Sequence, residues 1–109
     1  MKKLYDKHCE EISHGTKPLS QKRIDSLCKK LTTPWDVVDG VMLRQEFVFE
    51  DFIDAMVFVN DVAAVADGEN HHPSIHIHFQ KVTLDISTSV IGGLTENDFI
   101  IARKIELLL

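Results

Sequence analysis

The chain has 109 residues, 44% of them hydrophobic, which is enough for one compact domain with a modest core. Its formal net charge of -5 is unevenly placed, because residues 1–31 carry eight Lys and Arg against four Asp and Glu, whereas residues 32–109 carry four against thirteen. The acidic body argues against direct binding of nucleic acid, and the lack of a long apolar run or a signal-peptide core argues against a membrane span or secretion.

The first third of the chain predicts an arm followed by a helix. Residues 1–18 are polar and contain a Gly-Thr-Lys-Pro sequence, so we expect a loosely ordered arm before a domain over residues 19–109. Ser20 is a suitable N-cap for a helix over about residues 21–31. The apolar stripe of that helix would contain Ile24, Leu27, Cys28 and Leu31.

A hairpin is expected next. Pro34 disfavours helix at the residue before it, and residues 35–38 and 41–49 have the composition of two strands. Asp39-Gly40 between them is typical of a tight hairpin turn. In the second strand, alternate residues would share one face: Leu43, Gln45 and Phe47.

The strongest helix signal in the chain covers residues 51–67. Asp51 lies at its start, where a carboxylate interacts favourably with the helix dipole. The residues at helical spacing are Phe52, Ala55, Met56, Val59, Val62, Ala63 and Ala66. Residues 67–70, Asp-Gly-Glu-Asn, would close the helix.

Two more strands and a last helix complete the pattern. Residues 74–80 alternate with period two, which places Ile75, Ile77 and Phe79 on one face and His76 and His78 on the other. Gln80-Lys81 is a candidate turn into a strand over residues 82–89, and Thr95-Glu96-Asn97-Asp98 resembles a capping box of a helix to about residue 108. The order α-β-β-α-β-β-α predicts an α+β fold of two layers, a four-stranded antiparallel sheet with helices on one face.

Four of the six histidines lie within residues 71–78. His71 and His72 follow the C-terminal end of a helix, where the partial negative charge favours protonated imidazole. Pro73 restricts His72 to extended conformations, so the pair would be held rigidly and could divide acid and base work. The alternative for either histidine alone is a C-cap or a surface position.

Several other polar side chains are weaker candidates. Asp67 lies four residues before His71 and could orient an imidazole, or it could be a solvated carboxylate at a helix end. Asp98 is equally well explained as the acid of the capping box. The hydroxyls of Ser87, Thr88 and Ser89 lie at a strand end, where most such groups satisfy turns.

The remaining histidines and the cysteines give little support for a metal. His76 and His78 form a His-x-His pair, which is a common first half of a metal site, but no other cluster supplies further ligands. A solvated or interface face of the sheet explains them at least as well. Cys9 and Cys28 lack Cys-x-x-Cys spacing, so we expect thiols of a reduced, cytoplasmic protein, although a disulfide between them is the alternative.

From residue 20 to residue 108 the chain resembles the pterin-4a-carbinolamine dehydratase family. The residues that carry the resemblance are Trp35, the Asp39-Gly40 turn, Asp67, His71-His72-Pro73, Phe79, Ser87-Thr88 and the run Gly93-Leu94-Thr95-Glu96-Asn97-Asp98-Phe99. The resemblance implies dehydration of 4a-hydroxy-tetrahydropterin to quinonoid dihydropterin, with no metal or other cofactor. It implies that His71 and His72 are catalytic. The residues that would bind the substrate are Asp67, Pro73, Ser87, Thr88, Ser89 and Asp98.

One position departs from the family pattern. The family usually has a third histidine, or occasionally a tryptophan, where this chain has Ser89. A serine hydroxyl can form hydrogen bonds but does not titrate near neutral pH. If the missing imidazole transfers a proton, its loss would lower the rate by about 10²–10⁴. The alternative function is therefore a non-catalytic module that binds a pterin or a protein, like the transcription cofactors in the family.

The resemblance also implies a homodimer or homotetramer that does not bind nucleic acid or a membrane directly. The apolar C-terminal end, Ile105 with Leu107-Leu108-Leu109, agrees with self-association because such a segment needs to be covered.

Overall fold

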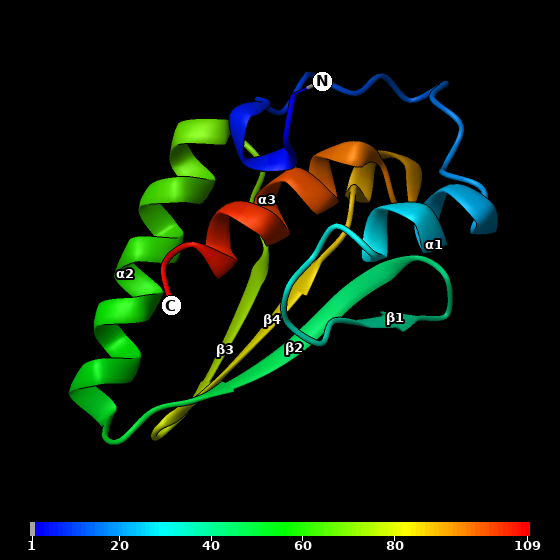
Figure 1. Cartoon of the computed structure of the whole chain (residues 1–109). Helices are drawn as coiled ribbons and strands as arrows, with labels where there is room; N and C mark the ends of the chain where they lie inside the picture. Colours follow the sequence, from blue (N-terminus) through cyan, green and yellow to red (C-terminus); the bar gives the residue numbers. More distant parts are fainter. Residues whose placement is uncertain (1) are drawn as a thin grey trace.

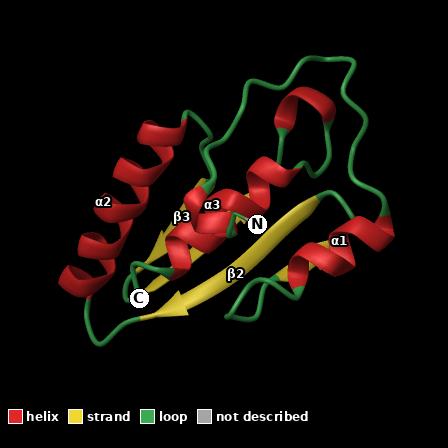
Figure 2. Ribbon diagram, turned by 45° about the horizontal axis from the view of Figure 1, so that its top comes forward, coloured by secondary structure: helices red, strands yellow, loops and turns green. Residues whose placement is uncertain are grey.

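The computed structural model describes residues 2–109, which form three α-helices, four strands and two short 3₁₀ helices. In chain order these are η1 (Leu4–Asp6), α1 (Gln21–Cys28), β1 (Asp36–Val38), β2 (Met42–Val48), α2 (Phe52–Glu69), β3 (Ser74–His78), β4 (Lys81–Ile86), η2 (Ser89–Ile91) and α3 (Glu96–Glu106). The strands form one antiparallel sheet in the order β1-β2-β4-β3. All three α-helices lie on one face of it (Figures 1 and 2). The predicted α+β class and element order are confirmed.

The core lies between the sheet and the helices. Alternate residues of β2 are buried, as the sequence predicts, and β4 adds a second row between β2 and β3. The buried strand residues are Leu43, Gln45, Phe47, Val82, Leu84 and Ile86. Against them α3 buries a continuous run from Asn97 to Ala102, so the first turns of that helix pack into the core. This position matters because Asp98 lies in that run.

The β1–β2 hairpin turns at Asp39-Gly40, as expected. Both residues have left-handed backbone, with φ of 53° and 72°. Two consecutive positive φ values are the signature of the tight turn that matches the twist of a hairpin, and Asp-Gly tolerates it well.

Several boundaries and faces differ from the prediction. Helix α1 ends at Cys28 and not at residue 31, while α2 continues to Glu69. In α2 the side chain of Phe58 is buried, whereas Phe52 and Ala63 are exposed. The expected stripe was therefore wrong at both of these exposed positions, because the helix rests on the sheet along the line of Ala55, Phe58, Val59, Val62 and Ala66.

The β3–β4 hairpin is shorter than the period-two pattern suggests. Strand β3 ends at His78, and Phe79 lies in the turn with Gln80, at a φ of 54°. Phe79 is therefore exposed and does not share the inner face with Ile75. Strand β4 starts at Lys81 and ends at Ile86, so residues 87–89 lie beyond the strand.

The N-terminal segment contacts the core and α3, although its polar composition predicts a loosely ordered arm. Leu4, in η1, is buried with the core, and the segment passes over α3 (Figure 1). The Arg103 guanidinium of α3 lies 5.4 Å from the centre of the Tyr5 ring. One buried leucine and polar contacts to α3 therefore hold a segment whose composition alone predicts that it is exposed to solvent.

In the part of the chain that the structure describes, no helix has the length and apolar character that crossing a membrane requires. Cys9 and Cys28 are both free thiols.

Candidate active site

The histidine pair is placed by the C-terminal end of α2. Asn70 adopts left-handed backbone with φ 52°, and its N–H and that of His71 return to the last turn of the helix at the Asp67 and Ala66 carbonyls. This is the common way in which a helix ends and its chain reverses, and asparagine accepts it better than most residues. His71 and His72 are therefore presented at the helix end, immediately before Pro73 and β3.

His71 forms a buried pair with Asp98. The His71 Nε2 lies 2.6 Å from the Asp98 Oδ1, and the side chains are 12% and 0% exposed. An acceptor carboxylate places the hydrogen of the imidazole on Nε2, which leaves Nδ1 to give or take a proton.

Asp98 itself is held by the start of α3. Its Oδ2 accepts the backbone N–H of Thr95 at 2.9 Å and the Thr88 hydroxyl at 2.8 Å. Because Thr88 uses its one hydrogen on Asp98, the Thr95 hydroxyl donates to the Thr88 oxygen at 2.8 Å. The carboxylate therefore caps the start of α3, as the capping-box interpretation predicts, and its other oxygen is the one that pairs with His71.

His72 forms a second pair, with Asp67, in a different environment. The His72 Nε2 lies 2.9 Å from the Asp67 Oδ1, but the side chains are 55% and 85% exposed. Because water screens charges at the surface, this pair is weak. The site thus contains one imidazole held by a buried carboxylate and one held by an exposed carboxylate.

A cavity of about 350 Å³ opens between these histidines and the segment after β4. It is lined by Glu11, Ile12, Asn70, His71, His72, Ser87, Thr88, Ser89 and Val90. Five of the candidate residues therefore meet at one cavity, whereas Asp67 and Asp98 stand behind the two imidazoles. Pro73 follows the pair without lining the cavity.

Sequence reasoning missed Glu11, Ile12, Asn70 and Val90 as lining residues. Asn70 could have been found from its position directly before the histidine pair. Glu11 and Ile12 gave no signal, because a polar segment some 60 residues from the histidines has no pattern that brings it to them.

His76 and His78 do not line this cavity. The His76 Nε2 lies 3.2 Å from the Asp85 Oδ2 on the outer face of the sheet, where the Arg44 Nε also donates to the Asp85 Oδ1 at 2.6 Å. The hydrogen bond from Arg44 lowers the pKa of Asp85 despite partial burial. Across residues 2–109, no three His, Cys, Asp or Glu side chains are grouped so that they could hold a metal ion.

Comparison with known proteins gives a consistent result. A family model described as pterin 4 alpha carbinolamine dehydratase matches residues 17–108. A Rickettsia canadensis protein with the name "Putative pterin-4-alpha-carbinolamine dehydratase" is 41% identical over 103 residues, which is 94% of each chain. A Nitrosomonas eutropha protein with the same name is 37% identical over 106 residues, which is 97% of this chain and 93% of the other.

A solved structure has the same fold. The crystal structure of a transcriptional coactivator/pterin dehydratase from Brucella melitensis matches with a TM-score of 0.78 and 28% identity, over 84% of this chain and 98% of the other.

Proposed function

This chain belongs to the pterin 4 alpha carbinolamine dehydratase family, and we propose that it dehydrates a 4a-hydroxy-tetrahydropterin to the quinonoid dihydropterin. The observation that carries the proposal is the pair of imidazoles, each bound to its own carboxylate, at one cavity. Asp98 and Asp67 take the Nε2 sides, so both rings keep a second nitrogen for proton transfer.

The chemistry needs one acid and one base. The bond from C4a to the hydroxyl oxygen breaks and the oxygen leaves as water, which requires a proton. The N5–H bond gives up its proton to a base, and its electrons form the C4a–N5 double bond. An imidazole can serve as an acid or as a base, so His71 and His72 can supply both groups.

The other candidate residues would act around this pair. Asp98 and Asp67 position the imidazoles, and Pro73 limits the backbone of His72. Ser87, Thr88 and Ser89 would offer hydroxyls to the substrate, although Thr88 already donates to Asp98. Because Ser89 cannot act as a base near neutral pH, we propose that turnover is slow compared with that of a site with three histidines.

The test is the dehydration rate of 4a-hydroxy-tetrahydropterin with the wild type, His71→Ala and His72→Ala. We expect each substitution to lower the catalysed rate by about 10²–10⁴. His78→Ala is the matched control, because this exposed imidazole lies outside the cavity and its loss should leave the rate unchanged.

The alternative is a non-catalytic module that binds a pterin or a protein. Ser89 favours it, and so does the word coactivator in the description of the Brucella protein. Saturable pterin binding with no rate above the spontaneous reaction would support the module and contradict the enzyme.

We also propose that the protein is a cytoplasmic homodimer or homotetramer. Its two free thiols fit a reducing compartment. Exposed apolar side chains support self-association, although the C-terminal end contributes less than expected: Ile105 is buried within the chain, and only Leu107 and Leu109 are exposed.

A further inference from the structure

The N-terminal segment supplies part of the wall of the histidine cavity, through Glu11 and Ile12. We propose that Glu11 binds the paired N–H donors of the pterin ring and so determines which bicyclic heterocycle the site accepts. This inference rests on the function proposed above. It goes beyond the family match, which starts at residue 17 and therefore does not include Glu11.

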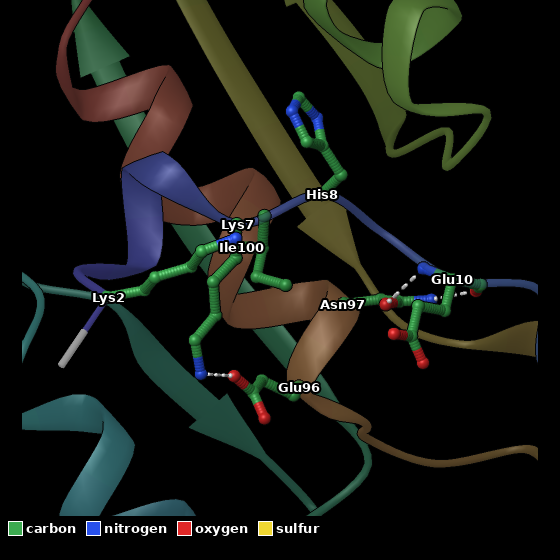
Figure 3. A pocket seen from close by; sticks show the side chains of 7 residues that line it. All are labelled: Lys2, Lys7, His8, Glu10, Glu96, Asn97 and Ile100. Carbon is green, nitrogen blue, oxygen red and sulfur yellow. Dashed lines mark hydrogen bonds and ion pairs between the residues drawn. The ribbon is translucent and has the colours of Figure 1, made fainter.

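Hydrogen bonds clamp the backbone directly before Glu11. The Glu10 N–H donates to the Asn97 Oδ1 at 3.0 Å, and the Asn97 Nδ2 donates back to the Glu10 carbonyl at 2.7 Å. Figure 3 shows the Asn97 side chain directed at Glu10 with both bonds drawn. Since Asn97 precedes Asp98 in α3, the segment is tied to the helix that orients His71.

A second anchor ties the segment to α2. The Cys9 N–H donates to the Glu69 Oε1 at 2.7 Å, and the Glu69 Oε2 lies 2.9 Å from both the Lys104 Nζ and the His8 Nδ1. Burial alone would raise the pKa of Glu69, but the bonds from Cys9, Lys104 and His8 outweigh it and lower the pKa to about 2. Glu69 is therefore ionised at neutral pH and holds the segment next to the C-terminal end of α2, which His71 and His72 follow.

Glu10 and Glu11 line different cavities. Glu10 lines a cavity over α3 with Lys7 and Glu96, where Lys7 and Glu96 form an ion pair (Figure 3). Glu11 lines the cavity of the histidine pair. Of two neighbouring carboxylates in one anchored segment, only the second is placed to contact a ligand of that site.

Glu11 is the sole carboxylate among the described residues that line the histidine cavity. The pyrimidine half of a pterin presents the N3–H and the 2-amino group side by side, a pair of donors that matches the two oxygens of a carboxylate. Of the reacting atoms, N5 lies in the other ring and C4a lies at the fusion of the two rings. Glu11 would therefore hold the ring by one edge while His71 and His72 act near the opposite one.

The test compares binding of pterin and of lumazine, in which a carbonyl replaces the 2-amino group. The wild type should bind pterin at least about tenfold more tightly, since a site that accepts a donor pair rejects an analogue lacking one of them. Glu11→Gln should weaken pterin binding about tenfold and bring the two affinities within about twofold, because an amide can also donate to the carbonyl. The side chain of Glu11 is exposed, so the substitution should not affect folding.

Glu10→Gln is the matched control, because the clamp uses only the backbone of Glu10. It should change neither affinity. In turnover, Glu11→Gln should raise KM and leave kcat within about twofold; a lower kcat with a changed pH profile would mean that Glu11 transfers a proton, which would overturn the assignment.

The outcomes separate this inference from the proposed function. If pterin binding depends on His71 but is the same in the wild type and Glu11→Gln, only the role of Glu11 is refuted. If the wild type binds neither heterocycle, the proposed function fails and the role of Glu11 fails with it.

Discussion

The two histidine–carboxylate pairs differ most in their exposure to water. Asp98 is fully buried and receives three hydrogen bonds, whereas Asp67 is 85% exposed and receives one. A buried carboxylate fixes the orientation and the tautomer of its imidazole, while an exposed one competes with water for the same hydrogen bond. The pairs should therefore respond differently to the same substitution.

We expect Asp98→Asn to lower kcat by at least about 10², because an amide can turn its N–H₂ toward His71 and select the wrong tautomer. Asp67→Asn should cost only a few fold, since water can replace the exposed contact. The measurement is kcat for both variants, with thermal unfolding to show that Asp98→Asn is folded despite the weakened helix cap. Equal losses would contradict the difference in role.

Ser89 allows a test by gain of function. If the missing imidazole limits turnover, Ser89→His should raise the dehydration rate, because the new ring would be at the cavity that His71 and His72 line. Ser87→His places an imidazole at the same cavity, two residues earlier, and serves as the positional control. An unchanged or lower rate for Ser89→His would show that a third base is not what limits the reaction.

At the scale of elements, short sequence patterns predicted individual strands and turns. Alternation of Leu43, Gln45 and Phe47 found β2 and its buried face, and Asp39-Gly40 found the hairpin. The period-two pattern failed at Phe79, because nothing in the alternation shows that the chain already turns there.

Contacts between distant residues could not be predicted in this way. Glu106 accepts hydrogen bonds from Thr32, Thr33 and the Trp35 indole, more than 70 residues earlier, and these outweigh burial and lower its pKa. The contact of Asn97 with Glu10 spans 87 residues. A sequence read in short windows contains no signal for either, which is why the histidine pair was found and the cavity wall opposite it was not.

Glu69 joins α2 to α3 and to the N-terminal segment, and its contribution to stability should depend on pH. Its pKa is about 2 in the folded protein against an ordinary value of 4.5, so its stabilisation is complete above pH 4.5 and is lost as the pH falls toward 2. The shift corresponds to roughly 3 kcal/mol. We expect Glu69→Gln to lower the free energy of unfolding by about 1–3 kcal/mol at neutral pH.

Urea unfolding of both proteins at neutral pH and at values below 4.5 is the measurement. The difference between them should shrink as the pH falls from 4.5 toward 2, because Glu69 of the unfolded wild-type chain then takes up a proton before Glu69 of the folded protein does. Glu46→Gln, an exposed carboxylate on the outer face of the sheet, should show no such difference. A difference for Glu69→Gln that is independent of pH would contradict the ionic anchor.

For the whole molecule, the feature without an internal explanation is the outward face of α2. Ile53 and Val57 lie one turn apart on it and are both exposed, with Phe52 beside them. The opposite side of the same helix carries its buried side chains and packs into the core. A helix that is apolar on both sides is typical of one that packs against a partner.

We therefore expect light scattering to give a mass of at least twice the 12.4 kDa of one chain. Ile53→Lys combined with Val57→Lys should reduce it to that of a single chain, because two charges at the contact would have to be desolvated. Val41→Lys, at an exposed apolar position in the β1–β2 turn, is the control and should leave the mass unchanged. A wild-type monomer would refute self-association.

Cys9 belongs to the anchored N-terminal segment, where its thiol donates to the Asn97 carbonyl and burial, chiefly, raises its pKa to about 12. Only a thiolate reacts readily with an aromatic disulfide reagent, so modification of this sulfur has to wait until the segment lifts away from α3. In a Cys28→Ser variant, Cys9 is the one remaining thiol, and the rate at which the reagent modifies it would report how often the segment opens. A heterocycle bound to Glu11 would hold the segment closed and lower the rate of Cys9 modification. Occupancy of the cavity could therefore be followed at a sulfur atom that does not line it.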